Sequence, residues 1–187
     1  MAKIGLTNFK FSVLDADEAV STPQSLGKAI SCKVSIETNT AELYADDALA
    51  ESDYSFKKGT ITLEVDEDAD TTFATLLGHT VTAGSTGTAG EVVRKATDIA
   101  PYVAVGRILT KVVNGVKSYK VEYLAKVQFK EPAPDEKTKG ESLEFATTSI
   151  EGTILQKADG EWSRAKTFAT LAEAQTYLTG LLTAKAS

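Results

Sequence analysis

Apolar and polar residues alternate along much of the chain, and this period of two predicts β-strands. The strictest alternation spans residues 29–38 and predicts a half-buried strand. Its apolar face carries Ile30, Cys32, Val34 and Ile36. The same pattern returns over 60–66, and a further strand is expected within 143–156. Residues 1–14 alternate more loosely and are interpreted as an extended N-terminal arm or as the first strand.

The two longest strand-like runs, 103–113 and 116–130, are separated only by Asn114-Gly115. Asn-Gly is a strong β-hairpin signal because both central residues of a type I′ turn need a positive φ. Each run is far longer than the roughly 5–6 residues usual for a strand. Such a ribbon is a poor catalytic scaffold, but it suits a sheet that continues from one subunit to the next.

The segment 46–58 is predicted to be a long loop between two strands, with the option that the first strand continues through 41–45. The segment combines acidic and basic residues with few apolar side chains. Hairpin loops usually have about 2–5 residues, so a connection of this length suggests that something binds it. In an assembly protein, the natural candidate is a neighbouring subunit.

Two helices are expected. The first lies within 68–78, with Asp70 as the N-cap and Gly78 at the C′ position. The second covers 170–183 and begins with a capping box formed by Thr170 and Glu173. Its apolar stripe contains Leu171, Ala174, Leu178, Leu181 and Leu182. We expect this stripe to pack on the domain's own sheet, and docking on a neighbouring subunit is the alternative.

These patterns predict a single domain over 1–187 that is mainly β, an antiparallel β-sandwich or barrel-like fold with one or two flanking α-helices. A chain of 187 residues can bury a sizeable core without a disulfide or a metal. The single cysteine, Cys32, is interpreted as a small buried hydrophobe. No run approaches the ~20 apolar residues of a membrane span and no signal core begins the chain, so we expect a soluble protein with no membrane partner.

The charge balance and the titratable residues favour no catalytic chemistry. A formal net charge of −6 argues against a nucleic-acid-binding surface, which needs clustered lysine and arginine. The only histidine, His79, is expected to be a surface or capping residue. The acidic run 66–70 lacks the glycine and glutamate of a calcium loop, which leaves at most a weak structural cation site. Glycines 84, 87 and 90 lack the lysine of a phosphate-binding loop, and Trp162 is expected to cover one end of the sheet.

An ordered set of segments resembles the major tail proteins, or tail tube proteins, of phages and prophages with long non-contractile tails. The segments are AELYADD (41–47), GTITLEV (59–65), LLGH (76–79), DIAPYVAVG (98–106), TKGE (138–141) and DGEW (159–162). The glycine-rich stretch 84–90 and the helix 170–183 fall outside this resemblance.

The resemblance implies a structural virion protein that is not an enzyme and has no cofactor. Its subunits would form hexameric rings that stack into the tail tube, the conduit for DNA ejection. The partners would be further copies of the chain and other tail proteins at the tube ends, with DNA passing through unbound. The protein would be made and assembled in the cytoplasm of the host bacterium and would reside in the virion tail. Family members stack through an N-terminal arm, a long loop and a C-terminal arm, which here match 2–13, 46–58 and, less closely, the C-terminal end.

Two sets of residues follow as candidates for the assembly. The candidates for stacking between rings are Asp46, Asp47, Glu51, Asp53, Tyr54, Phe56, Lys57 and Lys58. Glu37, Glu64 and Asp66 lie on polar faces of predicted strands and are candidates for an acidic lumen lining, which would repel phosphates. The alternative for these three carboxylates is an ordinary solvated sheet face.

Two other functions remain open at this point. The first is a receptor- or glycan-binding β-domain, similar to an adhesin, that uses the Asn114-Gly115 hairpin tip as its contact. The second is the inner tube protein of a contractile injection system, which forms the same kind of ring but adds a sheath.

Overall fold

The computed structural model describes residues 2–45, 48–66, 70–82, 84, 90–132 and 147–183. The strands are β1 (Ala2–Val13), β2 (Gln24–Ser25), β3 (Ala29–Thr38), β4 (Ala41–Ala45), β5 (Ala48–Asp53), β6 (Phe56–Val65), β7 (Thr80–Thr82), β8 (Glu91–Val93), β9 (Tyr102–Val113), β10 (Val116–Phe129), β11 (Thr148–Leu155) and β12 (Ser163–Phe168). The helices are α1 (Asp70–Leu77) and α2 (Leu171–Leu182). The expectation of a mainly β, antiparallel fold with two helices is confirmed.

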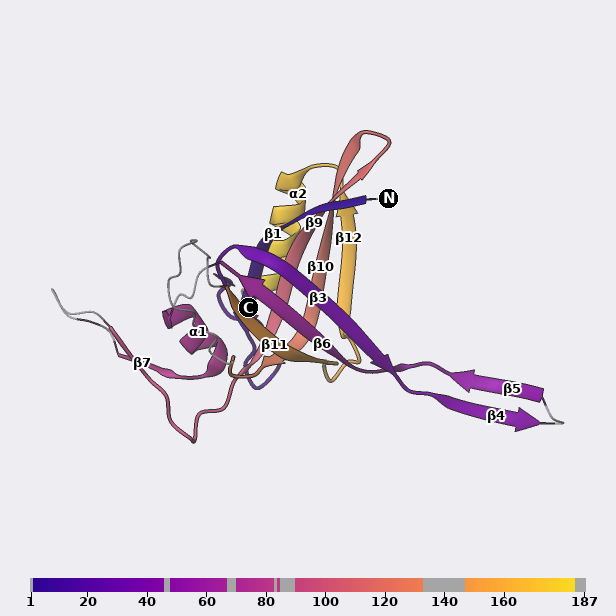
Figure 1. Ribbon diagram of the computed structural model, residues 1–187, viewed down its shortest axis with the longest axis horizontal. Helices are drawn as coiled ribbons and strands as arrows, with labels where there is room; N and C mark the ends of the chain where they lie inside the picture. The colour runs from indigo at the N-terminus through magenta and orange to yellow at the C-terminus, as the bar shows by residue number, and fades with distance from the viewer. Residues whose placement is uncertain are drawn as a thin grey trace, which may run out of the picture.

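One antiparallel sheet organises the body of the molecule. Its strand order is β2-β1-β9-β10-β11-β6-β3, and β12 also pairs with β10. The first part of β10 pairs with β12 up to Leu124, and its last part pairs with β11 from Lys126 onward. A register irregularity between Leu124 and Val127 marks the place where β10 changes neighbours. Figure 1 shows the consequence, because β3 and β6 run obliquely across β9 and β10 and make a second layer.

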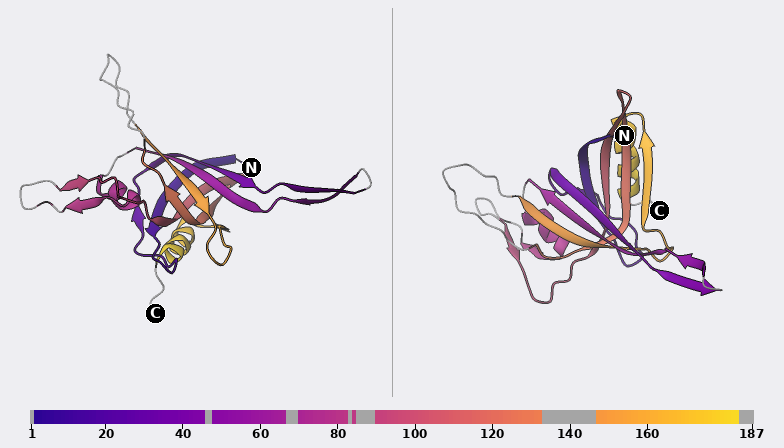
Figure 2. Two further views of the ribbon diagram at one scale, coloured as in Figure 1. Left: turned by 90° about the horizontal axis from the view of Figure 1, so that it is seen from below. Right: turned by 45° about the vertical axis from the view of Figure 1, so that its right-hand side comes forward.

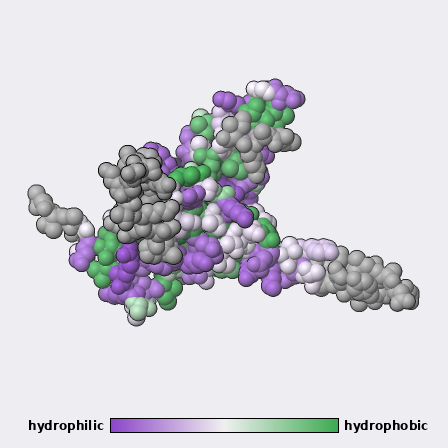
Figure 3. Space-filling model, in the orientation of Figure 1, coloured by the Kyte–Doolittle hydropathy of each residue, from purple (hydrophilic) through white to green (hydrophobic). Residues whose placement is uncertain are grey.

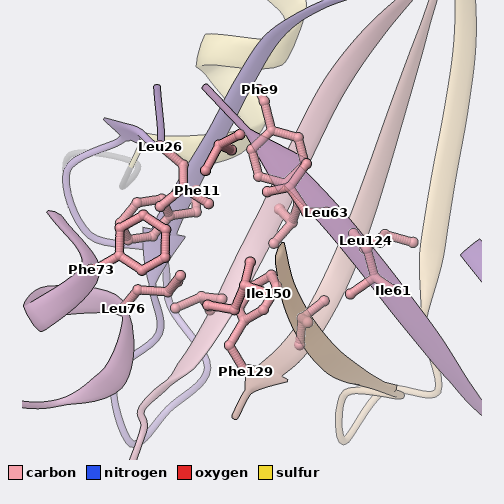
Figure 4. Packing of buried hydrophobic residues seen from close by; sticks show 14 of the residues in the cluster. Phe9, Phe11, Leu26, Ile61, Leu63, Phe73, Leu76, Leu124, Phe129 and Ile150 are labelled. Carbon is pink, nitrogen blue, oxygen red and sulfur yellow. The ribbon is translucent and has the colours of Figure 1, made fainter. Parts of the chain in front are cut away.

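The main core lies between these two layers, together with α1. Alternation along β9 directs Val103 and Val105 into this core, while Ala104 and Ile108 belong to a second cluster on the other face. Figure 4 shows how the core side chains converge from β1, β6, β10, β11 and α1. The residues labelled there are Phe9, Phe11, Leu26, Ile61, Leu63, Phe73, Leu76, Leu124, Phe129 and Ile150.

The second cluster lies beneath α2. Ala174, Leu178 and Leu182 are its buried helical members, so the apolar stripe packs on the domain's own sheet as expected. Thr170 caps α2 as predicted, since the Glu173 backbone N–H donates to Thr170 Oγ1 (3.3 Å), and Glu173 Oε2 accepts a hydrogen bond from the Thr170 hydroxyl (2.8 Å). A Cβ on Gly106 would collide with the Leu178 side chain, so this glycine sets how closely α2 approaches β9.

The long hairpin and the short helix also match the sequence. Asn114 and Gly115 have φ values of 51° and 79°, which are the positive values that a type I′ turn requires. Helix α1 includes Asp70 as its first residue, so it begins one residue earlier than the N-cap prediction for Asp70 implies, and Gly78 follows its last residue. Trp162 stacks on Phe56 at the margin of the main core, with ring centroids 4.5 Å apart, which agrees with its expected covering position.

Of the two interpretations of the N-terminal segment, the first strand is confirmed and the extended arm is not, because residues 2–13 pair with β9 from Val103 to Val112. Two further expectations need correction. The region 46–58 is not a loop, because it contains β5 and the first residues of β6. The apolar face of β3 is only partly buried: the exposed fractions of Ile30 and Ile36 are 52% and 38%, and Cys32 is half-buried. The reason is that β3 is the last strand of the sheet and has a register irregularity between Ala29 and Ser31.

Candidate assembly surface

The region between β3 and β6 forms a β-hairpin that projects from the body. Strands β4 and β5 pair antiparallel from Ala41 opposite Asp53 to Ala45 opposite Ala48, and they form a two-stranded sheet of their own. Figures 1 and 2 show this hairpin extending well away from the body in every view. We call β4 and β5 together, residues 41–53, the arm.

The arm continues directly from β3 and β6, and a polar junction joins it to the body. The Asn39 backbone N–H donates to the Ser55 carbonyl (2.8 Å), and the Asn39 side-chain amide donates to Ser55 Oγ (2.9 Å). These two bonds hold the strands together where the sheet narrows from several strands to two. The two strands are therefore joined to each other at the base of the arm.

The structure separates the predicted stacking residues into groups. Asp46 and Asp47 lie outside the described residues, and Glu51 and Asp53 belong to β5, where the structure describes the backbone alone. Tyr54, with an exposed fraction of 59%, and the exposed Lys57 lie at the base of the arm.

Phe56 and Lys58 belong to the body rather than to the arm. The Phe56 ring stacks on Trp162 with an interplanar angle of 4° and packs, partly buried, against the main core. Lys58 Nζ lies 3.5 Å from Glu37 Oε2 across the β3–β6 pair. Phe56 lies at the start of β6 rather than in a loop, and its predicted role in stacking between rings stays a prediction.

The outer face of β3 and β6 is polar, and it carries the candidate lumen residues. The register places Ser31 opposite Glu64, Lys33 opposite Thr62 and Glu37 opposite Lys58. Glu64 accepts hydrogen bonds from Ser31 Oγ (3.0 Å) and Thr147 Oγ1 (2.8 Å).

Asp66, just after β6, accepts a hydrogen bond from the Lys28 backbone N–H (2.9 Å), and the Lys28 ammonium lies 3.8 Å away. The structure thus brings Glu37 and Glu64 to one face, but lysines and hydroxyl groups share that face with them. It is a mixed polar face rather than a uniformly acidic one.

Three strands of the main sheet have one edge without a hydrogen-bonded neighbour. Within the described residues, β3 pairs with β6 only, β12 pairs with β10 only, and the two-residue β2 pairs with β1 only. Edge strands are templates for pairing with another chain unless they are short, charged or covered. Strand β3 has ten residues and exposes Ile30 and Ile36 beside Lys33, so its edge is only weakly protected.

A group of charged residues that the sequence did not reveal lies between β3 and the long hairpin. Arg107 on β9 forms an ion pair with Glu122 on β10 (Nη2 to Oε2, 2.6 Å), and Lys120 Nζ contacts the other carboxylate oxygen at 2.6 Å. These contacts hold the pKa of Glu122 below its usual value even though burial opposes them. A two-residue turn at Asn114-Gly115 fixes Arg107 opposite Glu122, so the hairpin register was the signal that could have found this pair.

Cys32 faces the same group. Arg107 Nη1 donates to Cys32 Sγ at 2.6 Å, which ties β3 to β9 across the sandwich. Burial raises the pKa of the Cys32 thiol, and the nearby Arg107 offsets this only in part. The thiol is therefore protonated at neutral pH and is a poor nucleophile.

His79 does not occupy the exposed position that the sequence suggested. Its backbone N–H donates to the Ala74 carbonyl at the end of α1 (2.8 Å), which agrees with a capping role. Its side chain, however, is only 8% exposed and lies between Asp98 (Nδ1 to Oδ2, 3.0 Å) and Glu131 (Nε2 to Oε2, 2.9 Å). The Asp98 hydrogen bond is the main cause of a raised His79 pKa, with Glu131 acting in the same direction against burial. No sequence pattern links these three residues, which lie far apart along the chain.

No group of three or more histidine, cysteine or acidic residues in the described part of the chain has an arrangement that could hold a metal ion. Among the described helices, none is both long and apolar enough to cross a membrane. Comparisons of the sequence with models of known protein families and with curated proteins give no match. The resemblance to tail tube proteins therefore stays a prediction.

Proposed function

We propose that this protein is a structural subunit that self-associates, and that the assembly is the tail tube of a long-tailed phage or prophage, built of stacked hexameric rings around a passage for DNA. The single observation that carries the proposal is the arm, a two-stranded hairpin that extends from the body and whose described strands pair only with each other. The ring, the tube and the location in a virion come from the sequence resemblance.

The arm needs a partner for physical reasons. An isolated two-stranded hairpin is at best marginally stable in water, because it has too little sheet to bury an apolar face. The arm's sequence includes Leu43, Tyr44 and Leu49, residues whose burial would be favourable. A neighbouring subunit would provide the surface on which these residues and the backbone edges of the arm become covered.

The open edge of β3 supports association within a ring. A contact in which one surface of a subunit binds a different surface of the next closes into a ring when the rotation permits. Pairing the β3 edge with a strand of the next subunit would satisfy its free backbone groups. The polar outer face of β3 and β6 suits a passage for DNA, because hydroxyl groups and mixed charges present no basic surface that would hold phosphates.

Electron microscopy of purified protein at low and high concentration tests the proposal. We expect rings or hollow tubes at high concentration. A variant in which residues 41–53 are replaced by Asn-Gly should remain folded by circular dichroism but should form no tubes, because the body retains its core and the Asn39–Ser55 junction.

The matched control is Val116→Ser, which alters another exposed projection, the tip of the β9–β10 hairpin, and leaves the arm intact. Tubes of normal length from the arm-less variant would refute the assigned role of the arm. A wild-type chain that stays monomeric at every concentration would count against the whole proposal.

One observation favours the binding-domain alternative. The exposed fractions of Val113 and Val116 beside the Asn114-Gly115 turn are 39% and 68%. Figure 3 shows hydrophobic residues at this upper end of the molecule, where the turn lies in Figure 1. If this tip binds a receptor, Val116→Ser abolishes adhesion to host cells and the arm-less variant does not.

A further inference from the structure

We propose that His79 is a protonation-dependent clasp: the imidazolium ring links Asp98 to Glu131, and loss of its proton opens the Glu131 contact. The clasp joins three parts of the chain, the end of α1, the connection between β8 and β9, and the end of β10. It does not depend on the proposed function.

The geometry requires a doubly protonated ring. Both ring nitrogens of His79 lie within hydrogen-bond distance of a carboxylate oxygen, at 3.0 Å for Asp98 and 2.9 Å for Glu131. A carboxylate can only accept, and a neutral imidazole has one N–H and one lone pair. Only the imidazolium form donates to both carboxylates, while the neutral ring turns a lone pair toward one of them.

The contact that opens is the one to Glu131. Asp98 is 12% exposed, and its Oδ2 also accepts a hydrogen bond from the Lys95 backbone N–H at 2.9 Å. The Glu131 side chain is 52% exposed, and its other oxygen lies 3.4 Å from Arg94 Nε. Glu131 can therefore turn to Arg94 and water at little cost, whereas Asp98 is held in place.

The remaining charged groups around the ring do not reverse this order. Arg94 and Lys95 come from the β8–β9 connection, and Lys130 comes from the end of β10. The Arg94 side chain is 63% exposed, so water screens its charge, and Lys130 Nζ is directed to Glu151 Oε1 at 2.7 Å. From the end of α1, Leu77 lines the same pocket as the ring and has no charge. The two carboxylates thus dominate the field at the imidazole.

The clasp controls the point at which the chain leaves the sheet. The Lys130 backbone N–H donates to the Glu151 carbonyl at 2.9 Å, the last ladder bond of β10, and Glu131 follows directly. With Glu131 bound to His79, this end of β10 is tied to α1. When the contact opens, the last ladder bond of β10 loses that support.

Nuclear magnetic resonance tests the clasp without ambiguity, because His79 is the only histidine of the chain. Nitrogen-15 shifts of the ring are followed across a pH titration. We expect a pKa above the ordinary value and, at high pH, the Nδ1–H tautomer, because Nδ1 keeps its bond to Asp98. Free histidine prefers the other tautomer, so an Nε2–H ring at high pH would overturn the proposal.

Two variants separate the roles of the carboxylates. D98N should lower the His79 pKa more than E131Q, and E37Q, which removes a remote exposed carboxylate, should leave it unchanged. In the wild type, the exchange protection of the Lys130 amide should fall as His79 loses its proton. In E131Q, the exchange protection of the Lys130 amide should not depend on the protonation of His79. The side-chain amide introduced by this substitution can either donate or accept a hydrogen bond, so it can pair with the protonated and with the neutral imidazole. The clasp would be refuted if His79 had the same pKa in E131Q and in E37Q. It would also be refuted if the exchange protection of the Lys130 amide in the wild type did not change as His79 titrates.

Discussion

The β9–β10 ribbon and the arm are both antiparallel hairpins, yet they differ in what surrounds them. The ribbon has β1, β11 and β12 as further strands, α2 on one face, and the Arg107–Glu122 pair on the other. The arm is a sheet of two strands with polar bonds at its base. The difference indicates that the two hairpins have different roles. The ribbon stabilises the subunit, and the arm can contact a neighbouring subunit.

The largest effect is expected from a cavity beneath α2. Leu178 is 1% exposed and belongs to the second cluster, so Leu178→Ala should lower the free energy of unfolding by about 3–4 kcal/mol. Leu49→Ala in the arm should change it by less than about 0.5 kcal/mol while it weakens assembly. Urea unfolding of both variants measures the two free energies of unfolding. A similar decrease in both variants would mean that the arm belongs to the folded core.

The next largest effect concerns the ion pair of the ribbon. Glu122→Gln keeps the shape of the side chain but leaves Arg107, whose side chain is 11% exposed, without its counter-charge. We expect a loss of about 2–3 kcal/mol, because an unpaired charge is then partly buried. The double variant R107M/E122L should recover most of this loss in the same urea experiment. A single variant as stable as the wild type would show that the pair adds nothing to the ribbon.

A smaller effect defines the boundary between the arm and the body. Phe56→Leu keeps an apolar side chain but removes the stacking on Trp162, and should cost about 1 kcal/mol of stability without affecting assembly. Tyr54→Ser, two residues closer to the arm, should leave stability within about 0.5 kcal/mol and weaken assembly instead. Thermal unfolding and electron microscopy of both variants locate the boundary. If Phe56→Leu blocks assembly, the boundary lies inside β6.

The smallest effect is the pH dependence from His79 and Asp98. The folded-state pKa of His79 is raised, so its contribution is fully present below the unfolded value near 6.5 and is lost as pH rises through the folded pKa. The folded-state pKa of Asp98 is lowered, so its contribution is present above about 3.8 and is lost as pH falls through the folded pKa. Urea midpoints at a series of pH values should therefore be highest between these limits, and His79→Gln should flatten the alkaline side. An unchanged alkaline slope in that variant would assign the effect to other groups.

The parts of the fold that the sequence predicts are those set by local rules. Asn114-Gly115 determines its turn through backbone φ values, and Thr170 with Glu173 determines the start of α2 through two short-range hydrogen bonds. Such signals act within a few residues, so no knowledge of the rest of the molecule is needed.

The arm shows why part of the candidate site was missed. Segment 46–58 is rich in charge and has no clear alternation, so it was interpreted as a loop. In the structure β5 pairs with β4 through backbone hydrogen bonds, which do not require an alternating sequence. His79, Asp98 and Glu131 meet only because α1, the β8–β9 connection and β10 come together in the fold. Neither the β4–β5 pairing nor the contacts of His79 produce a periodic pattern of residues in the sequence.

The continuity of β3 and β6 with the arm has a mechanical consequence. A pull on the arm along its length acts on both strands together and reaches the rest of the sheet through β11, which pairs with β6 from Thr148 to Ile154. The force then runs parallel to the strands, and the hydrogen bonds of that ladder must yield together rather than open one after another from an end. Because β3 and β6 continue into the arm, a force along the arm loads this ladder in shear, and the arm resists being pulled away from the body.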